Sequence, residues 1–163
     1  MLIQLKNKDT LHFDDFLFKC AIGKKGISSK KKEGDFSTPK GIFSIKYLYY
    51  RSDRLIKPET KIIIKKLKKN MGWCNDPKSK KYNSLVNIKE KIRHEKMYRK
   101  DHKYNIIIVI NYNLKKPIPH KGSAIFIHLT NNYKPTAGCI ALKENDLLIL
   151  LKLVNKKTKI KIN

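Results

Sequence analysis

The sequence predicts a mainly β fold, with sandwich-like mixed sheets, one clear helix in the C-terminal half and few others. Three observations support this prediction. Short β-rich runs, several with two-residue alternation, recur along the whole chain. Only one segment carries a convincing apolar stripe at helical spacing. Apolar residues make up 40% of the 163 residues, which is enough to bury a core despite the high charge.

The predicted strands follow from these runs. In chain order they are residues 2–5, 16–22, 41–50, 61–64, 104–112, 124–129, 140–142 and 158–162. Residues 106–110 are apolar throughout, so we expect a central strand that is buried on both faces. The sequence Lys-Ile-Lys-Ile at residues 159–162 alternates, and we expect this last strand to have one face in water.

The clear helix is predicted from residue 144 to about residue 154. Glu144, Asn145 and Asp146 lie at its N-terminal end, where capping and the helix dipole favour them. Residues 88–100 form a second candidate helix, because Glu90 and Glu95 lie near Lys and Arg residues that would pair with them on an exposed face. The apolar stripe of the first helix consists of Leu147, Leu148, Leu150, Leu151 and Val154.

The length fits a single domain, residues 1–163, with no internal repeat and no linker. Two long polar regions, residues 23–39 and 70–87, interrupt the β pattern. Long loops on a compact scaffold are more often functional than accidental. We therefore expect part of the functional site to come from these loops.

The composition is strongly basic. The 38 Lys and Arg against 13 Asp and Glu give a net charge of +25, which favours polyanions or anionic surfaces as neighbours. The lysines are spread from Lys6 to Lys161 rather than gathered in one motif, which favours a solvated basic surface, and no specific nucleic acid is expected. A non-catalytic module that binds nucleic acid or an anionic surface remains an alternative.

The cysteines and histidines predict neither a disulfide framework nor a metal site. Cys20, Cys74 and Cys139 are odd in number and include no Cys-x-x-Cys pair. Cys20 lies in an apolar run and Cys74 has no base nearby in sequence, so both are expected to be structural. The remaining histidines have no carboxylate or Cys at ligand spacing, and they are His12, His94, His102 and His120.

The candidate chemistry lies around one polar loop. His128 ends one predicted strand, and Cys139 follows Gly138 where the next strand begins. A strand, a loop and a return strand would bring the imidazole within reach of the thiol as a general base, and we expect Cys139 to be partly thiolate at neutral pH. The N–H groups of Gly138 and Cys139 would then point at a developing oxyanion. The alternative is that Cys139 is a small core residue and His128 a satisfied polar group.

Two sequence segments resemble a known family. Thr136-Ala137-Gly138-Cys139-Ile140, with His128 upstream in Ile-Phe-Ile-His, resembles the YkuD-type L,D-transpeptidase catalytic domain. That signature is a histidine followed downstream by Ser/Thr-x-Gly-Cys and an aliphatic residue. Residues 33–43, Glu-Gly-Asp-Phe-Ser-Thr-Pro-Lys-Gly-Ile-Phe, resemble the Thr-Pro-x-Gly segment early in the same domain. Residues 49–54, 72–76 and 82–83 further resemble loops of a bacterial subgroup.

The resemblance implies a reaction on peptidoglycan stem peptides without a cofactor. Cys139 would attack the carbonyl between the third stem residue and the terminal D-Ala, releasing D-Ala and leaving a thioester. His128 would take the thiol proton and later activate the acceptor amine. Thr136 would lie close to the active site, and Gly138 with Cys139 would supply oxyanion donors. A diaminopimelate amine as acceptor gives 3-3 cross-links, whereas water as acceptor gives an L,D-carboxypeptidase or cross-link hydrolase.

The sequence departs from the family pattern at three positions. Many members have Gly, His and Arg where this chain has Leu129, Ala137 and Ala141. The loop between His128 and Cys139 is also shorter than in most members. These changes leave the thiol chemistry in place, but they remove an arginine that would recognise the substrate.

Other residues are candidates for substrate binding. Arg51, Arg54 or one of many lysines would contact the stem carboxylates. Trp73 would either stack on a glycan or stem peptide or serve as a partly buried anchor.

The family implies a periplasmic or cell-envelope location, where the positive charge would retain the protein on an anionic envelope. No stretch reaches the roughly 18 apolar residues of a transmembrane helix. No signal peptide is recognisable, so a cytoplasmic location also stays open.

Overall fold

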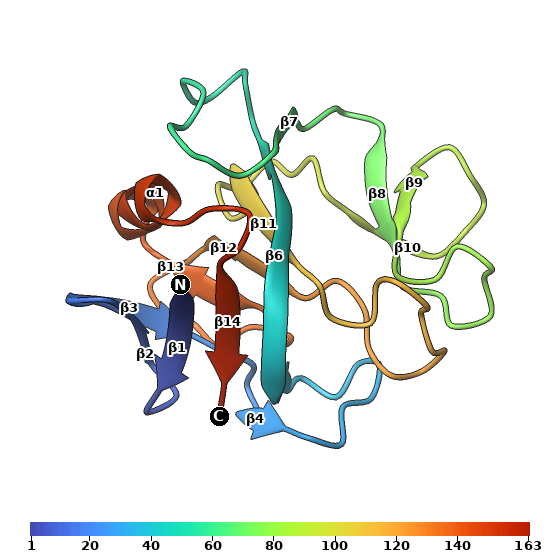
Figure 1. Cartoon of the computed structure of the whole chain (residues 1–163). Coiled ribbons are helices and arrows are strands. Elements are labelled where there is room, and N and C mark those ends of the chain that lie inside the picture. The colour runs from blue at the N-terminus through green and yellow to red at the C-terminus, as the bar shows by residue number, and fades with distance from the viewer.

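A mixed β-sheet that closes on itself organises the chain, and the computed structural model describes residues 1–163 (Figure 1). One helix, α1 (Glu144–Leu153), accompanies the strands. The strands are β1 (Leu2–Lys6), β2 (Thr10–Phe13), β3 (Phe16–Ala21), β4 (Ile27–Ser28), β5 (Thr38–Pro39), β6 (Gly41–Tyr50), β7 (Ile64–Lys66), β8 (Met71–Cys74), β9 (Leu85–Asn87), β10 (His94–Lys96), β11 (Ile106–Ile110), β12 (Phe126–Leu129), β13 (Ile140–Leu142) and β14 (Lys159–Ile162).

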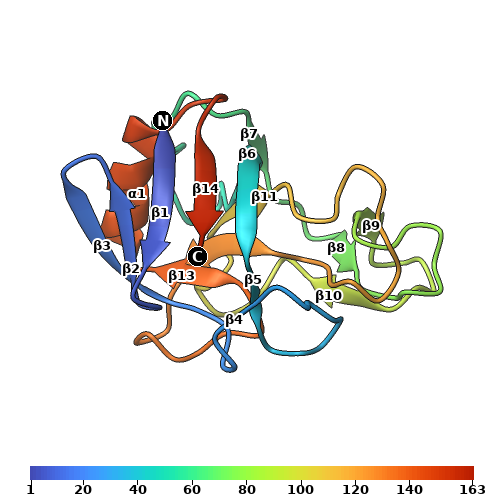
Figure 2. The same cartoon turned by 60° about the horizontal axis from the view of Figure 1, so that its bottom comes forward.

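The large sheet has nine strands in the order β11-β12-β13-β3-β2-β1-β14-β6-β7. Because β11 also pairs with β6, all of these strands except β7 form a closed ring. The pairs β1–β14, β12–β13 and β6–β7 are parallel and the others are antiparallel, so the sheet is mixed as predicted. Figure 2 shows β13 running across the direction of β1, β14 and β6, which makes the ring resemble two crossed layers. The predicted mainly β class with one helix is confirmed.

Strand β11 separates two hydrophobic cores. Ile106, Ile108 and Ile110 belong to the larger core, which the ring and α1 enclose, and α1 contributes Leu147, Leu150 and Leu151 to it. The intervening residues Ile107 and Val109 point into a second core. All residues of β11 are buried, which confirms the prediction for this strand. The second core also contains Trp73, Tyr104, Phe126 and Cys139, so the candidate nucleophile packs on the opposite face of β11 from the main core.

A small sheet, β10-β8-β9, lies at the end of the molecule away from α1 (Figures 1 and 2). Its strand β10 lies within residues 88–100, the region that was predicted to be the second helix. That prediction is wrong, because residues 94–96 pair with β8 as a strand instead. Met97, which directly follows, is fully buried in the second core. Pairing with β8 and burial of Met97 stabilise the extended chain here more than exposed side-chain pairs would stabilise a helix.

The other predicted strands and the C-terminal helix agree with the structure to different degrees. Each predicted strand overlaps an observed one, although only Ile64 of residues 61–64 belongs to β7. The short strands β2, β4, β5, β8, β9 and β10 were not predicted. In α1, the acidic residues Glu144 and Asp146 lie in the first turn as the helix dipole favours, but Lys143 is the N-cap and no side chain caps the helix. No helix has the length and apolar character that crossing a bilayer requires.

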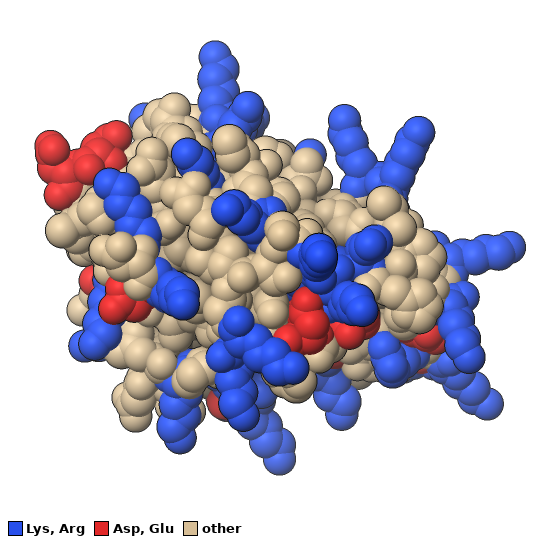
Figure 3. All heavy atoms as spheres, turned by 90° about the horizontal axis from the view of Figure 1, so that it is seen from below, with Lys and Arg blue, Asp and Glu red and all other residues tan.

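Basic residues are scattered over the face of the molecule that Figure 3 shows. On the face shown in Figure 3, Lys and Arg side chains project in several directions, with a few acidic residues between them. This arrangement agrees with a solvated basic surface rather than a single binding stripe.

Truncation of β11 should test the closed core. Ile108 is fully buried, and we expect Ile108→Ala to lower the free energy of unfolding by about 2–5 kcal/mol. Ile63, which is 50% exposed, provides the control, and Ile63→Ala should cost less than about 0.5 kcal/mol. Urea unfolding of both variants measures the difference. Equal costs would show that β11 does not hold the core together.

Candidate active site

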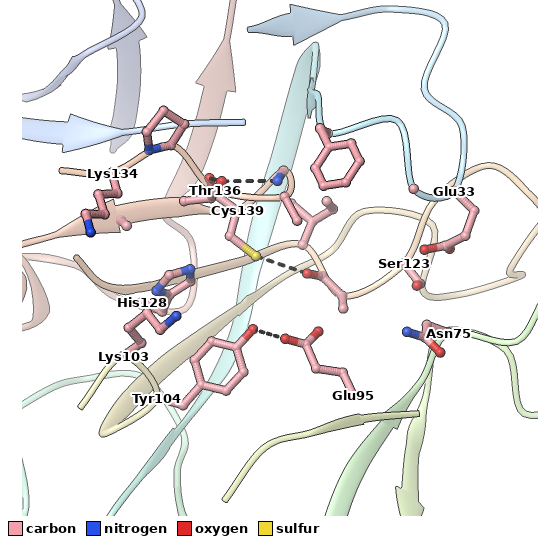
Figure 4. Close-up of a pocket in the computed structure, with 18 of the residues that line it drawn as sticks. Glu33, Asn75, Glu95, Lys103, Tyr104, Ser123, His128, Lys134, Thr136 and Cys139 are labelled. Atoms are coloured by element: carbon pink, nitrogen blue, oxygen red, sulfur yellow. Dashed lines mark hydrogen bonds between the residues drawn. The ribbon is translucent and has the colours of Figure 1, made fainter. Parts of the chain in front are cut away.

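A cavity of about 560 Å³ lies beside the second core and brings the predicted chemical residues together. Cys139, His128, Gly138 and Thr136 all line it (Figure 4). Ala137 and Ala141 line it as well. The predicted catalytic residues therefore share one cavity.

Parallel pairing of β12 with β13 places the base beside the nucleophile. His128 lies in β12 opposite Ala141 of β13, and Ile127 lies opposite Ile140. Cys139 immediately precedes β13, so its side chain enters the cavity next to the strand that carries His128 (Figure 4). The prediction of a return strand is wrong, because β13 runs parallel to β12 and not antiparallel to it.

His128 is held in one tautomer. Its Nδ1 lies 2.8 Å from the carbonyl oxygen of Leu129, which can only accept a hydrogen bond, so Nδ1 carries the proton and Nε2 is a free acceptor. The ring packs edge-on against Tyr104, with 5.2 Å between the centroids. Burial lowers the pKa of His128 to about 4, so the imidazole is neutral near pH ~7.

Cys139 is a buried thiol. It is 8% exposed, and its Sγ donates to the carbonyl oxygen of Ala124 at 3.2 Å. Burial, together with the negative charge of Glu95, raises the pKa of Cys139 to about 12. The expectation of a partly formed thiolate at neutral pH is therefore wrong, because the surroundings of the sulfur disfavour the charged form.

Thr136 shapes the turn that carries the nucleophile. Its hydroxyl donates to the Cys139 carbonyl at 2.6 Å and accepts from the Gly138 N–H at 3.1 Å. The Gly138 N–H is thus engaged and is not free for an oxyanion, contrary to the prediction. The Cys139 N–H has no acceptor within the protein and remains available.

The loop 23–39 supports the same turn. Gly23 forms a parallel bridge with Thr136, and the Gly23 N–H donates to Thr38 Oγ1 at 2.9 Å. Gly138 has φ +142°, and a Cβ there would lie 2.7 Å from the carbonyl oxygen of Ser37. The two segments that resemble the family motifs are therefore packed directly against each other.

Two carboxylates in the cavity were not predicted as site residues. Glu95 of β10 accepts a hydrogen bond from the Tyr104 hydroxyl, and Glu33 of the loop 23–39 accepts one from Tyr82. Both glutamates line the cavity. Glu33 belongs to the segment 33–43 that resembles the family motif, so the sequence identified its surroundings but not its role. Glu95 falls in the region predicted to be a helix, and no sequence signal identified it as a site residue.

The predicted substrate-binding residues lie elsewhere. Arg51 is buried and donates twice to Asp53, and Arg54 donates to the backbone carbonyls of residues 100 and 101. Trp73 is 1% exposed, and its Nε1 donates to Asn83 at 2.9 Å, so it is a buried anchor without a face free for stacking. None of the three lines the cavity, and its basic residues are instead Lys31, Arg99, Lys103 and Lys134.

The other cysteines lie outside the cavity. Cys20 and Cys74 are free and buried, and burial raises the pKa of Cys20 to about 12. Nowhere in the chain do three or more His, Cys, Asp or Glu side chains form a group that could hold a metal ion.

Comparison with known proteins agrees with the motif resemblance. The model of the L,D-transpeptidase catalytic domain, YkuD, matches residues 3–162. A crystal structure of the helical cell shape determining protein Pgp2 from Campylobacter jejuni superposes with a TM-score of 0.53 and 19% identity, and a point variant of the same protein gives 0.52 and 18%. In each case 99% of this chain is covered but only 46% of the other, so the chain spans about half the length of these structures. No curated protein matches the sequence.

Substitution of Gly138 should disrupt the nucleophile turn. We expect Gly138→Ala to lower the free energy of unfolding by more than about 2 kcal/mol, because the strained φ and the contact with Ser37 add together. Gly26 has φ +77° with open space around it, so Gly26→Ala should carry only the backbone cost of about 1–2 kcal/mol. Urea unfolding measures both variants. A Gly138→Ala cost no larger than that of Gly26→Ala would show that the contact with Ser37 is unimportant.

Proposed function

The chain belongs to the YkuD family of L,D-transpeptidase catalytic domains, and from this premise we propose that it is a cysteine acyltransferase that forms 3-3 cross-links in peptidoglycan. The family implies a peptidoglycan substrate and typically acts in the cell envelope. The observation that carries the proposal is the shared cavity of Cys139 and His128, with the free Nε2 of the imidazole as the proton acceptor.

The first step is acylation of the thiol. Cys139 Sγ attacks the carbonyl carbon between the third stem residue and the terminal D-Ala, and His128 Nε2 takes the thiol proton. The C–N bond then breaks, the proton passes from His128 to the leaving amine, and D-Ala departs. A thioester remains on Cys139.

The second step releases the acyl group. The amine of a second stem attacks the thioester carbonyl while His128 removes a proton from it, and the C–S bond breaks. The proton returns to the sulfur, which restores the thiol. Water in place of the amine would give the carboxypeptidase or hydrolase reaction with the same residues.

Burial determines how the proton moves. The pKa of Cys139 is raised to about 12 and that of His128 is lowered to about 4, so a resting thiolate–imidazolium pair is disfavoured. Proton transfer therefore accompanies attack, when negative charge passes from sulfur to the carbonyl oxygen. The free Cys139 N–H is the available backbone donor for that oxygen.

Basic residues on the cavity wall suit the terminal carboxylate of the stem. Lys31 already pairs with Asp35, and Arg99 with Asp101. Lys134 has no ion-pair partner, and Lys103 has only a 3.8 Å contact with Asp101. Lys103 and Lys134 are thus the cations best able to bind a substrate carboxylate, in place of an arginine at position 141.

Product analysis tests the reaction. Incubation of the protein with tetrapeptide muropeptides should release D-Ala and give cross-linked dimers, which mass spectrometry distinguishes from trimmed tripeptides. Cys139→Ala should reduce turnover by at least ~10³-fold, because the thiol is the nucleophile. Cys20→Ala removes a buried thiol outside the cavity and serves as the control. Full turnover by Cys139→Ala would refute the proposal, and tripeptides without dimers would identify water as the acceptor.

The same site should have an unusual pH profile. Acylation of Cys139 by a carbapenem should keep its rate from about pH 8 to about pH 5 and fall only as the pH nears ~4. The base must be neutral, and the pKa of His128 is lowered to about 4, so acid protonates it only there. Mass measurement of the adduct over time gives the rate, with circular dichroism at each pH to verify the fold. A midpoint near ~6.5, the ordinary histidine value, would contradict this assignment.

A further inference from the structure

The two carboxylates of the cavity have no cationic partner. One oxygen of Glu95 accepts from Tyr104, one oxygen of Glu33 accepts from Tyr82, and the second oxygen of each makes no hydrogen bond within the protein. Neither forms a salt bridge, although the chain contains 38 Lys and Arg. Loss of water raises the pKa of Glu95 and the charge of Glu33 adds to this, while Arg99 and Lys103 act in the opposite direction without forming an ion pair with it. An unpaired carboxylate of this kind is costly unless a ligand supplies the positive charge.

A third acceptor lies in the same place. Ser123 is 8% exposed and lines the cavity, and its Oγ is the one buried side-chain polar atom without a hydrogen bond of good geometry, although it lies near enough to the Tyr82 hydroxyl to lower the pKa of that tyrosine. Buried polar atoms almost always have a partner, so an orphaned hydroxyl that faces a cavity points to a ligand. Figure 4 shows Ser123 beside Glu33, within the same cavity as Glu95.

The cavity therefore has an acidic side and a basic side. In Figure 4, Glu33, Ser123 and Asn75 lie on one side of Cys139, and Lys103 and Lys134 lie on the other, with Glu95 projecting towards the centre. A substrate with a carboxylate at one end and a positive charge at the other would match both sides. The free acceptors on the acidic side are one oxygen of Glu95, one of Glu33 and the hydroxyl of Ser123.

We propose that Glu95, Glu33 and Ser123 form a subsite for a primary ammonium group, the side-chain amine of a diamino acid at the third position of the donor stem. This inference rests on the proposed function, because it places the third residue at Cys139. An ammonium has three donors and no acceptor, which matches the three free acceptors. Hydrogen bonds between an ammonium and carboxylates are among the stronger ones in a partly dehydrated site.

The position of Glu95 connects the subsite to the chemistry. Glu95 and Cys139 line the same cavity (Figure 4), and after burial the charge of this carboxylate is the next cause of the raised pKa of Cys139. The thioester forms at the carbonyl of the third residue, and the side chain of that residue must therefore lie near Cys139. An ammonium bound at Glu95 offsets the negative charge that opposes the thiolate. A substrate with the amine thus makes the thiol easier to deprotonate than one without it.

Binding of matched peptides to Cys139→Ala tests the subsite without turnover. The probes are a tetrapeptide with diaminopimelate at the third position and its aminopimelate counterpart, which keeps the side-chain carboxylate but lacks the side-chain amine. Calorimetry should show at least ~10-fold weaker binding of the peptide without the amine. Glu95→Gln combined with Glu33→Gln should reduce this preference to less than ~3-fold, because the amides carry no charge. Glu59→Gln, which removes an exposed carboxylate outside the cavity, should leave the preference unchanged.

The outcomes separate the subsite from the reaction. Equal binding of the two peptides by the Cys139→Ala protein overturns the subsite, whatever the turnover of the wild type. A preference that survives in the double glutamine variant, whose fold circular dichroism verifies, also overturns the subsite. An amine preference without D-Ala release would refute the reaction and leave the subsite standing.

Discussion

The short parallel connection from β12 to β13 is the constraint on which the site depends. Parallel neighbours usually need a crossover of a dozen or more residues with a helix, and here the chain makes it with a polar loop alone. Such a loop needs a defined end, which Thr136 provides by bonding to both Gly138 and Cys139. The loop 23–39 packs on this turn through Ser37, so two distant sequence segments form one structural unit. The position of the sulfur follows from that packing rather than from the strands alone.

Burial gives this unit its chemistry. The second core that anchors Cys139 also packs Tyr104 against His128, and both Cys139 and His128 are almost fully buried. As a result, neither the thiol nor the imidazole carries a charge before a substrate arrives. Deprotonation of the thiol then depends on what the substrate brings, which is a carbonyl that accepts the developing charge and, in the proposed subsite, a cation beside Glu95. The tyrosine that packs on the base also orients that carboxylate, so Tyr104 links the two halves of the site.

Local sequence patterns predicted the elements that depend on local interactions. Strand β11 and helix α1 have apolar patterns that leave few alternatives, and Cys139 and His128 are recognisable because their spacing around one polar loop is itself a local signal. Closure of the sheet depends on pairing between β11 and β6, which no local pattern encodes. Residues 94–96 have polar side chains suited to a helix surface, and only β8 makes them a strand. Arg51 and Arg54 lie outside the cavity for the same reason, since both donate to backbone carbonyls of residues 99–101, far away in sequence. Of the two alternatives for Trp73, the structure shows the buried anchor, which bonds to Asn83.

The position of Ala141 bears on the proposed recognition of the substrate. It is fully buried opposite His128, so an arginine there would place a cation directly beside the base. With alanine, the cations of the cavity wall come instead from other segments, and residues 95–104 supply Arg99 and Lys103 together with Glu95 and Tyr104. One segment therefore carries both charges that a stem peptide with a carboxylate and an amine would meet. This segment contributes neither the thiol nor the base, so under the proposed function changes in its residues would alter the choice of substrate and leave the acyl-transfer chemistry the same.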